Sequence, residues 1–312
     1  MYDRFGNESV LSLRDAPLPQ PAHGQVQVRV RMASLNPVDF KLRSGILRLL
    51  GRPKRPAITG KDFAGEITAL GPEVRDFQLG QRVFGSVDPM GGQGSCAQFV
   101  ALATALVAAT PDALSDEVAA SLPVASGTAL QCLTDIARLQ CGQTILITGA
   151  SGAVGASAVQ LAHSIGAHIT GVCSSANFDY VRALGAAQLI DYKTQDWLQL
   201  DRPFDVIFDA AAAASFSQAR PLLAAEGLYI NTMPRPELYW AALVARLGSR
   251  QRCVPFLLKT DASLLQRLAA LAAERVIVPH IHEVVDLAQV AQAQRRMQEG
   301  KVHGKICVRI SG

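Results

Sequence analysis

Apolar and polar residues follow one pattern in the first third of the chain and another in the rest. Residues 26–32 (VQVRVRM) alternate apolar and polar side chains, which predicts a half-buried antiparallel strand. Residues 33–45 are expected to form a loop and a short helical turn, and turns rich in glycine and proline separate further short strands at 60–71, 80–85 and 97–100. Short strands at this density predict a small, partly open β-barrel.

From Ser115 onward, continuous apolar runs alternate with helical segments. The candidate strands are 144–148, 168–172, 188–191, 205–209, 227–232 and 252–257, and the segments of helical composition are 153–165, 177–184, 215–223 and 237–246. We also expect helices at 129–139, 261–273 and 284–300, and a last strand at 305–310. Strands that alternate with helices predict an α/β domain with a doubly wound parallel sheet.

A glycine-rich turn joins the first strand of this sheet to its helix. The residues of the turn and of the helix start are Gly149, Ser151, Gly152, Ala153, Val154 and Gly155. Their G-x-x-G-x-x-G spacing differs by one residue from the dinucleotide fingerprint, but the strand before it and the helix after it are those that the fingerprint requires. Glycines here allow a tight turn and a close approach of phosphate, and the helix start attracts anions. We therefore predict nucleotide binding, with a turn that binds no ligand as the alternative.

The end of the second strand of the sheet indicates which nucleotide is bound. An NAD site usually has a carboxylate at this point, which binds the ribose 2′-hydroxyl. This strand instead ends with Cys173, Ser174 and Ser175, and the two serine hydroxyls can donate to a 2′-phosphate. The sequence therefore predicts NADP(H), with Tyr192 and Lys193 as candidates to complete the pocket. Ser174 and Ser175 can also cap the following helix, and the two roles are compatible.

Composition restricts the partners of the chain. Its 312 residues predict two domains, and a net charge of +4 without clustering argues against nucleic acid. The basic pairs Arg29/Arg31 and Lys41/Arg43 are interpreted as solvated faces. The six scattered cysteines have no metal-binding spacing and are expected to be reduced, mostly buried thiols. With a polar N-terminus and no apolar run of membrane-spanning length, we expect a cytoplasmic protein without a membrane partner.

Seven stretches together give nearly the whole chain a resemblance to a known family. They are 36–41 (NPVDFK), 59–65 (TGKDFAG), 80–85 (GQRVFG), 119–123 (AASLP), 149–155 (GASGAVG), 173–175 (CSS) and 304–306 (GKI). The chain resembles the medium-chain dehydrogenase/reductase superfamily, in its zinc-independent NADPH:quinone oxidoreductase-like branch. The resemblance implies a GroES-like, partly open β-barrel catalytic domain at 1–114, to which residues 275–312 return. It also implies a Rossmann NADP-binding domain at 115–274.

The same resemblance provides a test for zinc. Zinc-dependent relatives carry a cysteine near the position of Asn36 and a Gly-His-Glu where this chain has Gly60, Lys61 and Asp62. A catalytic zinc needs about three protein ligands, and a protonated lysine cannot serve as one. We therefore predict no metal.

The resemblance further implies hydride transfer from NADPH to quinones or α,β-unsaturated carbonyls. Asn36 would hydrogen-bond near the nicotinamide ribose or the substrate oxygen, Asp39 belongs to the same catalytic loop, and Lys61 would stabilise the oxyanion that forms. The alternatives are a capped turn for Asn36 and Asp39, and an exposed charge paired with Asp62 for Lys61. The further cofactor contacts that it implies are Thr128, Ala210, Asn231 and Lys305.

Two other functions stay open at this stage. One is a catalytically idle NADPH-binding protein with a structural or regulatory role. The other is an enoyl-thioester reductase, which would need a tyrosine acid in the first domain, where Tyr2 is the only tyrosine before residue 100. The family resemblance also suggests a homodimer, in which the strand at 252–257 pairs across a two-fold axis.

Overall fold

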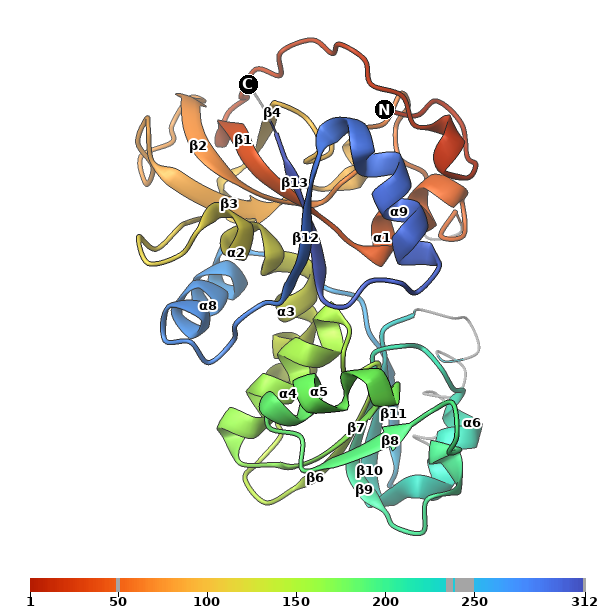
Figure 1. Ribbon diagram of the computed structural model, residues 1–312. Helices are drawn as coiled ribbons and strands as arrows, with labels where there is room; N and C mark the ends of the chain where they lie inside the picture. The colour runs from red at the N-terminus through yellow and green to blue at the C-terminus, as the bar shows by residue number, and fades with distance from the viewer. Residues whose placement is uncertain (49–50, 234–237, 239–249, 311–312) are drawn as a thin grey trace. The chain divides into compact units, whose positions relative to one another are not determined.

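The computed structural model describes residues 1–48, 51–233, 238 and 250–310, and it divides into two compact units (Figure 1). Unit 1 comprises Met1–Gly127 and Thr260–Gly312, and unit 2 comprises Thr128–Lys259. Apart from Leu238, the predicted helix at 237–246 lies outside the described residues. All six cysteines are free thiols, five of them buried.

Unit 1 is built on a curved, mostly antiparallel seven-stranded sheet. Its strands are β1 (Gln25–Leu35), β2 (Asp62–Leu70), β3 (Arg82–Ser86), β4 (Phe99–Ala103), β5 (Val107–Ala109), β12 (Ile281–Asp286) and β13 (Lys305–Arg309). They lie in the order β12-β13-β1-β2-β3-β5, and β4 pairs with β1. The alternation seen in the sequence places Val26, Val28 and Val30 in the core. Ala33–Leu35, expected as a loop, extend β1 because they pair with β13.

The helices of unit 1 are α1 (Pro37–Ser44), α2 (Asp116–Ser121), α8 (Ala262–Ala273) and α9 (Val290–Gln298), and α3 (Pro123–Leu130) starts in it. The predicted helix at 284–300 starts too early. Val284 and Val285 belong to β12 because they pair with Cys307 and Val308 of β13. Asp286 then forms a capping box with Gln289, and α9 begins after that turn.

The prediction that Arg43 lies on a solvated face is wrong, because its side chain is fully buried. Its Nε donates to Gln294 Oε1 on α9 at 2.8 Å, and Nη1 donates to the carbonyl oxygen of Gly6 at 2.8 Å. Gln294 donates in turn to the Thr59 hydroxyl at 2.8 Å. These uncharged acceptors make burial of a guanidinium tolerable, and counting charges in a sequence does not reveal them.

The unit boundaries differ from the predicted domain boundaries at 115 and 275. The chain passes into unit 2 only at Thr128 and returns to unit 1 already at Thr260. Helix α2 packs against β1 and β2 of unit 1, where the Ser34 hydroxyl donates to the carbonyl oxygen of Ala120 at 2.7 Å. Arg82 on β3 also binds Asp116 at 2.8 Å. Helix α8 packs against β5 of the same unit. The change to a helical pattern is visible in the sequence, but the core that a helix joins is decided by such tertiary contacts.

Unit 2 contains a six-stranded parallel sheet, as the alternating pattern predicts. Its strands are β6 (Thr144–Thr148), β7 (His168–Cys173), β8 (Gln188–Asp191), β9 (Phe204–Asp209), β10 (Leu223–Asn231) and β11 (Arg252–Pro255). They lie in the order β11-β10-β9-β6-β7-β8. Strand β10 starts earlier than predicted because Leu223 already pairs with Phe204 of β9.

The helices of unit 2 include α4 (Ala153–Ile165), α5 (Phe178–Ala183) and α6 (Phe216–Ala219). Helix α4 has the predicted bounds, whereas α6 is shorter than predicted because a 3₁₀ turn with Pro221 follows it. The predicted helix at 129–139 is divided between the end of α3 and a π-helix at Gln131–Ile136.

Candidate functional site

The glycine-rich turn of unit 2 follows β6 directly, and its three glycines have different roles. Gly149 has a φ of +61°, a conformation that glycine adopts without strain. A Cβ at Gly155 would lie 2.1 Å from the carbonyl oxygen of Gly149, so α4 approaches the turn this closely only because residue 155 has no side chain. A Cβ at Gly152 would meet only that same oxygen, at 3.3 Å. Gly152 therefore borders open space at the helix start.

Helix α4 begins at Ala153 with Gly152 as its N-cap residue, and no side chain caps it. Val154 and Gly155 complete the first turn, with Ser151 just before it. The first N–H groups of a helix have no partner within the helix and carry its positive dipole end. An uncapped helix start beside a glycine with open space fits the pyrophosphate of a dinucleotide.

Asn177 connects the glycine-rich turn to the end of β7, and the sequence analysis did not single it out. Its buried Nδ2 donates to Ser151 Oγ at 3.2 Å and to Ser174 Oγ at 3.0 Å. Both serines accept these bonds, so their own hydroxyl hydrogens stay available for donation. Cys173 is buried at the strand end, and burial raises the pKa of its thiol to about 11. In the sequence, this bridge was indicated only by the position of an asparagine two residues after the serine pair.

Strand β7 ends without a carboxylate, but a carboxylate from the neighbouring strand lies near the predicted 2′-phosphate position. Asp191 ends β8 and lies opposite Cys173 of β7. Its carboxylate accepts from the backbone N–H of Lys193 at 3.0 Å and from the Ser175 hydroxyl, and these bonds lower the pKa of Asp191. The neighbouring Tyr192 is 59% exposed. The carboxylate comes from a neighbouring strand, so inspection of β7 alone could not reveal it.

A second buried carboxylate organises the loops after β9 and β10. Asp209 is fully buried, and Oδ1 accepts from the Thr148 hydroxyl at 2.5 Å. Oδ2 accepts from the Tyr229 hydroxyl at 2.7 Å and from Asn231 Nδ2 at 3.1 Å. Asn231 is itself fully buried, and its Oδ1 accepts from the backbone N–H of Met233 at 2.8 Å. The Asn231 side chain therefore fixes the start of the loop after β10. Its predicted contact with the cofactor stays a prediction.

Two other predicted cofactor contacts lie in unit 2. Thr128 is buried on α3, and Ala210 follows β9, where its carbonyl oxygen accepts from the Thr232 hydroxyl at 3.1 Å. Strands β6, β7 and β9 are neighbours in a parallel sheet. The turn after β6, the serines after β7 and Ala210 after β9 therefore share the carboxyl edge of the sheet, where ligands of such sheets gather.

Lys305, the last predicted cofactor contact, belongs to unit 1 and lies beside Asn36. Strand pairing brings it there, because Leu35 at the end of β1 pairs with Ile306 of β13. On the other side of β1, Ser34 pairs with Asp62, the first residue of β2. Asn36 follows β1 and thus lies between the starts of β2 and β13.

Asn36, Asp62 and Lys305 form one buried hydrogen-bonded cluster. Asn36 Nδ2 donates to Asp62 Oδ2 at 2.9 Å, and Lys305 Nζ donates to Asn36 Oδ1 at 2.8 Å. Lys305 Nζ also lies 3.5 Å from Asp62 Oδ2, to which the backbone N–H of Val124 donates at 3.1 Å. Exposure is 2% for Asn36 and Lys305 and 0% for Asp62. The sequence analysis did not predict this pairing of Asp62 with Lys305, although both residues lie in the quoted motifs.

Asp39 lies in the first turn of α1, beside this cluster. Its Oδ2 accepts from the backbone N–H of Asn36 at 2.7 Å, as the alternative of a capped turn requires. Burial raises the pKa of Asp39 to about 7, against the hydrogen bond from Asn36 and the charges of Lys305 and Lys61. The Asp39 carboxyl can therefore hold or release a proton near neutral pH.

Lys61 is half-buried and close enough to Asp39 to act on it electrostatically. The alternative for Lys61 was an ion pair with Asp62. In the described part of the chain Asp62 pairs with Lys305 instead, because β2 and β13 both flank the end of β1.

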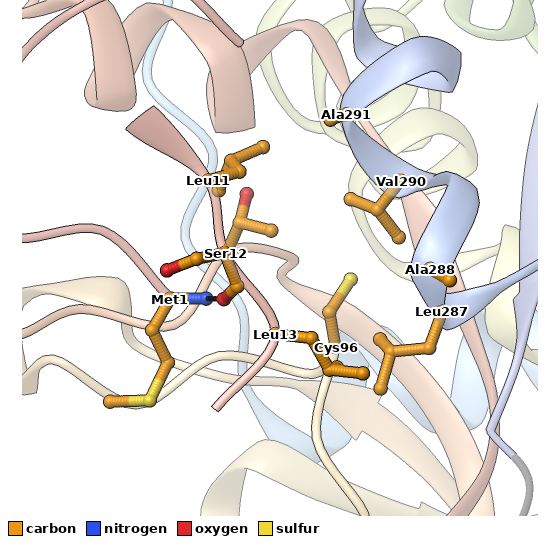
Figure 2. A pocket seen from close by; sticks show the side chains of 10 residues that line it. Met1, Leu11, Ser12, Leu13, Cys96, Leu287, Ala288, Val290 and Ala291 are labelled. Carbon is orange, nitrogen blue, oxygen red and sulfur yellow. Dashed lines mark hydrogen bonds between the residues drawn. The ribbon is translucent and has the colours of Figure 1, made fainter. Parts of the chain in front are cut away.

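Unit 1 also has a small cavity of about 70 Å³ between the N-terminal segment and the start of α9 (Figure 2). Its lining is mostly apolar and includes Leu11, Leu13, Cys96, Leu287 and Val290. None of the predicted site residues lines it. Across the described ranges, no group of three or more His, Cys, Asp or Glu side chains is placed to hold a metal ion.

Comparison with known proteins gives two family matches along the chain. Residues 22–112 match the alcohol dehydrogenase GroES-like domain, and residues 184–308 match the zinc-binding dehydrogenase family. The structure of the quinone oxidoreductase from Coxiella burnetii superposes with a TM-score of 0.90 and 29% identity, covering 99% of this chain and 98% of that one.

Curated relatives agree with these matches. The chloroplast envelope quinone oxidoreductase homolog of Arabidopsis thaliana is 34% identical, over 98% of this chain and 96% of its own length. The 2-methylene-furan-3-one reductase of Solanum lycopersicum is 34% identical, over 67% of this chain and 55% of its own length. The mitochondrial NAD(P)H oxidoreductase RTN4IP1 of Bos taurus is 32% identical, over 72% of this chain and 61% of its own length.

Two of these relatives correct the expectation of a cytoplasmic protein, because one is named as a chloroplast envelope protein and the other as a mitochondrial protein. The expectation rested on a polar N-terminus and the lack of a long apolar run, and these features do not distinguish the cytoplasm from the interior of an organelle. Among the described helices, none is long and apolar enough to cross a membrane.

Proposed function

Because this chain belongs to the medium-chain dehydrogenase/reductase superfamily, in its quinone oxidoreductase-like branch, we propose that it reduces quinones or α,β-unsaturated carbonyls with NADPH and without a catalytic metal. The observation that carries the proposal is the pair of sites within one chain. Unit 2 offers an uncapped helix start beside Gly152, and unit 1 offers buried polar side chains around Asn36.

The dinucleotide would be held by unit 2. The N–H groups at the start of α4 would bind the pyrophosphate, with Gly152 allowing its close approach. The hydroxyl of Ser174 and the ammonium of Lys193 would bind the 2′-phosphate, which supports NADPH over NADH. A bound nicotinamide supplies the hydride, and the protein provides orientation and electrostatics.

The residues of unit 1 would act on the substrate. Quinones and conjugated carbonyls are already electrophilic, so they need mainly positioning and a source of protons. Asn36 would donate a hydrogen bond to the substrate oxygen, and the Lys61 ammonium would stabilise the negative charge that develops there. Asp39 would hold a proton on its carboxyl near neutral pH.

The test is NADPH consumption by the purified protein with a simple para-quinone and with a simple conjugated enone, in the presence of a metal chelator. We expect turnover with NADPH, less turnover with NADH, and no loss of rate on chelation. The Lys61→Gln variant should lower kcat, whereas the matched Lys301→Gln, at an exposed lysine of the same unit, should not. Loss of activity on chelation would contradict the metal-free mechanism.

An NADPH titration and an enoyl-thioester substrate, added to this experiment, decide between the alternatives. NADPH binding without turnover of any quinone or enone would replace the proposal with the idle NADPH-binding protein. Turnover restricted to acyl-thioesters would identify an enoyl-thioester reductase, and Tyr2 would then be the first tyrosine to substitute.

A further inference from the structure

The Asn36 carboxamide lies between two opposite charges that come from two different strands. Its oxygen faces the ammonium of Lys305 at 2.8 Å, and its nitrogen faces the carboxylate of Asp62 at 2.9 Å. The three side chains are buried, so water does not screen these contacts.

A carboxamide has nearly the same shape after a 180° rotation, so sterics alone do not fix its orientation. Rotation of Asn36 would turn its oxygen toward the Asp62 carboxylate and its NH₂ group toward the Lys305 ammonium. Each contact would then pair two acceptors or two donors inside the protein, and both charge-assisted hydrogen bonds would be lost. The two charges thus select one of the two orientations.

The two charges are themselves held by the backbone. Asp62 is the first residue of β2 and accepts from the backbone N–H of Val124, and Lys305 is the first residue of β13. Both strands pair with β1, which ends beside Asn36. The strand register therefore fixes where the carboxylate and the ammonium lie.

We propose that Asp62 and Lys305 are positioning residues that lock the Asn36 carboxamide so that it offers its nitrogen, a hydrogen-bond donor, to the substrate oxygen. The role of Asn36 as that donor rests on the proposed function. One Nδ2 hydrogen is bonded to Asp62, which leaves the second for the substrate. A locked donor favours substrates with an oxygen acceptor at this point and needs no reorientation when negative charge develops on that oxygen.

A double-mutant cycle tests the lock. Asn36→Ala should lower kcat by about 100-fold, as loss of one oxyanion donor does. Asp62→Asn keeps an acceptor for Val124 and Asn36 but removes the charge, and it should lower kcat by about tenfold with little change in the NADPH Kd. In the Asn36→Ala background, Asp62→Asn should lower kcat by less than about twofold, because it acts through Asn36. Additive effects would overturn the proposal.

Lys305→Gln tests the same coupling from the other charge, in case Asp62→Asn fails to fold. We expect the same non-additivity with Asn36→Ala and an unchanged NADPH Kd. An increase in that Kd of about tenfold or more, with additive effects on kcat, would assign Lys305 to the cofactor and contradict the lock. Asp286→Asn, at an exposed carboxylate that pairs with Arg309 of β13, is the matched control and should leave kcat unchanged.

A second measurement does not depend on turnover. The side-chain ¹⁵N–¹H₂ signals of Asn36, assigned by their loss in Asn36→Ala, should show one hydrogen shifted strongly downfield by the carboxylate. Asp62→Asn should reduce this shift. Such a result in a protein without quinone or enone turnover would keep the lock and reject the proposed function. Two Asn36 hydrogens with the ordinary separation of a solvated carboxamide, unchanged in Asp62→Asn, would reject the lock itself.

Discussion

Asp39 is a buried carboxyl whose pKa of about 7 links its charge to pH in the neutral range. In the unfolded chain its pKa returns to 3.8, so between pH 4 and 7 the folded state binds more protons. The free energy of unfolding should therefore fall as pH rises, by up to about 1.4 kcal/mol per unit, and become level above pH 7. Asp39→Asn should remove this fall, because its amide oxygen can still accept from Asn36.

Urea unfolding of both proteins at pH 5 and pH 8 measures this. The stability of Asp39→Asn relative to the wild type should increase by about 3 kcal/mol from the lower to the higher pH. Asp286→Asn serves as the control at an exposed carboxylate. A stability difference that is the same at both pH values would mean that the pKa of Asp39 is not raised.

Asp191 allows a second prediction at the scale of single residues. Hydrogen bonds from Lys193 and Ser175 lower its pKa, so its carboxylate is charged beside the proposed 2′-phosphate site. Asp191→Asn should lower the KM for NADPH by about fivefold and change that for NADH less. The control is Glu226→Gln, an exposed carboxylate of the same unit that pairs with Arg250. Equal changes for both cofactors would place the 2′-phosphate elsewhere.

Single residues also show what a sequence can predict about a site. The spacing at 149–155 was sufficient to single out the glycines, whereas Asn36 and Asp39 were singled out by the family resemblance of residues 36–41. The Asp62–Lys305 and Ser175–Asp191 contacts were not foreseen, because they join residues from different strands whose register only the folded sheet defines.

At the scale of elements, two glycines of the glycine-rich turn have different roles: Gly155 lets α4 pack against the turn, and Gly152 leaves room for the cofactor phosphate. Gly155→Ala would place a Cβ 2.1 Å from a backbone oxygen, so α4 would have to move away from the turn. We expect the free energy of unfolding to fall by about 3 kcal/mol, the upper end of the usual cost of overpacking a core. Gly152→Ala meets the same oxygen at only 3.3 Å and should keep the fold but weaken NADPH binding.

Thermal unfolding and NADPH titration of both variants measure this difference. The expected result is a strong loss of melting temperature for Gly155→Ala and a weakened Kd with a nearly unchanged melting temperature for Gly152→Ala. If Gly152→Ala bound NADPH as the wild type does, the phosphate would not approach residue 152.

Elements with a strong local pattern were predictable, and those decided by long-range pairing were not. Helix α4 has its predicted bounds because a glycine turn starts it and Gly166, with a φ of +85°, ends it. Residues 284–286 have an apolar pattern that suits a helix or a strand, and pairing with β13 decides for the strand. Long-range pairing also decides the structure of Ala33–Leu35, which belong to β1 because they pair with β13.

At the scale of the whole molecule, each unit has its own buried core. Both tryptophans of the chain, Trp197 and Trp240, fall within the residues of unit 2, and Trp197 is buried in its core. In a Trp240→Phe variant, tryptophan fluorescence comes from Trp197 and reports on unit 2, whereas circular dichroism reports on the helices and strands of both units.

This separation allows the two cores to be followed in one experiment. A ligand that binds only the folded state at 100 times its Kd stabilises that state by about 2.7 kcal/mol. If unit 2 alone holds the dinucleotide phosphates, NADP⁺ should move the fluorescence transition to a higher urea concentration. In the circular dichroism transition, only the part that comes from unit 2 should move. Gly152→Ala, compared at the same NADP⁺ concentration, should reduce the shift. Coincident transitions that move together would show instead that the two cores unfold as one cooperative system, so that cofactor binding to one unit stabilises both.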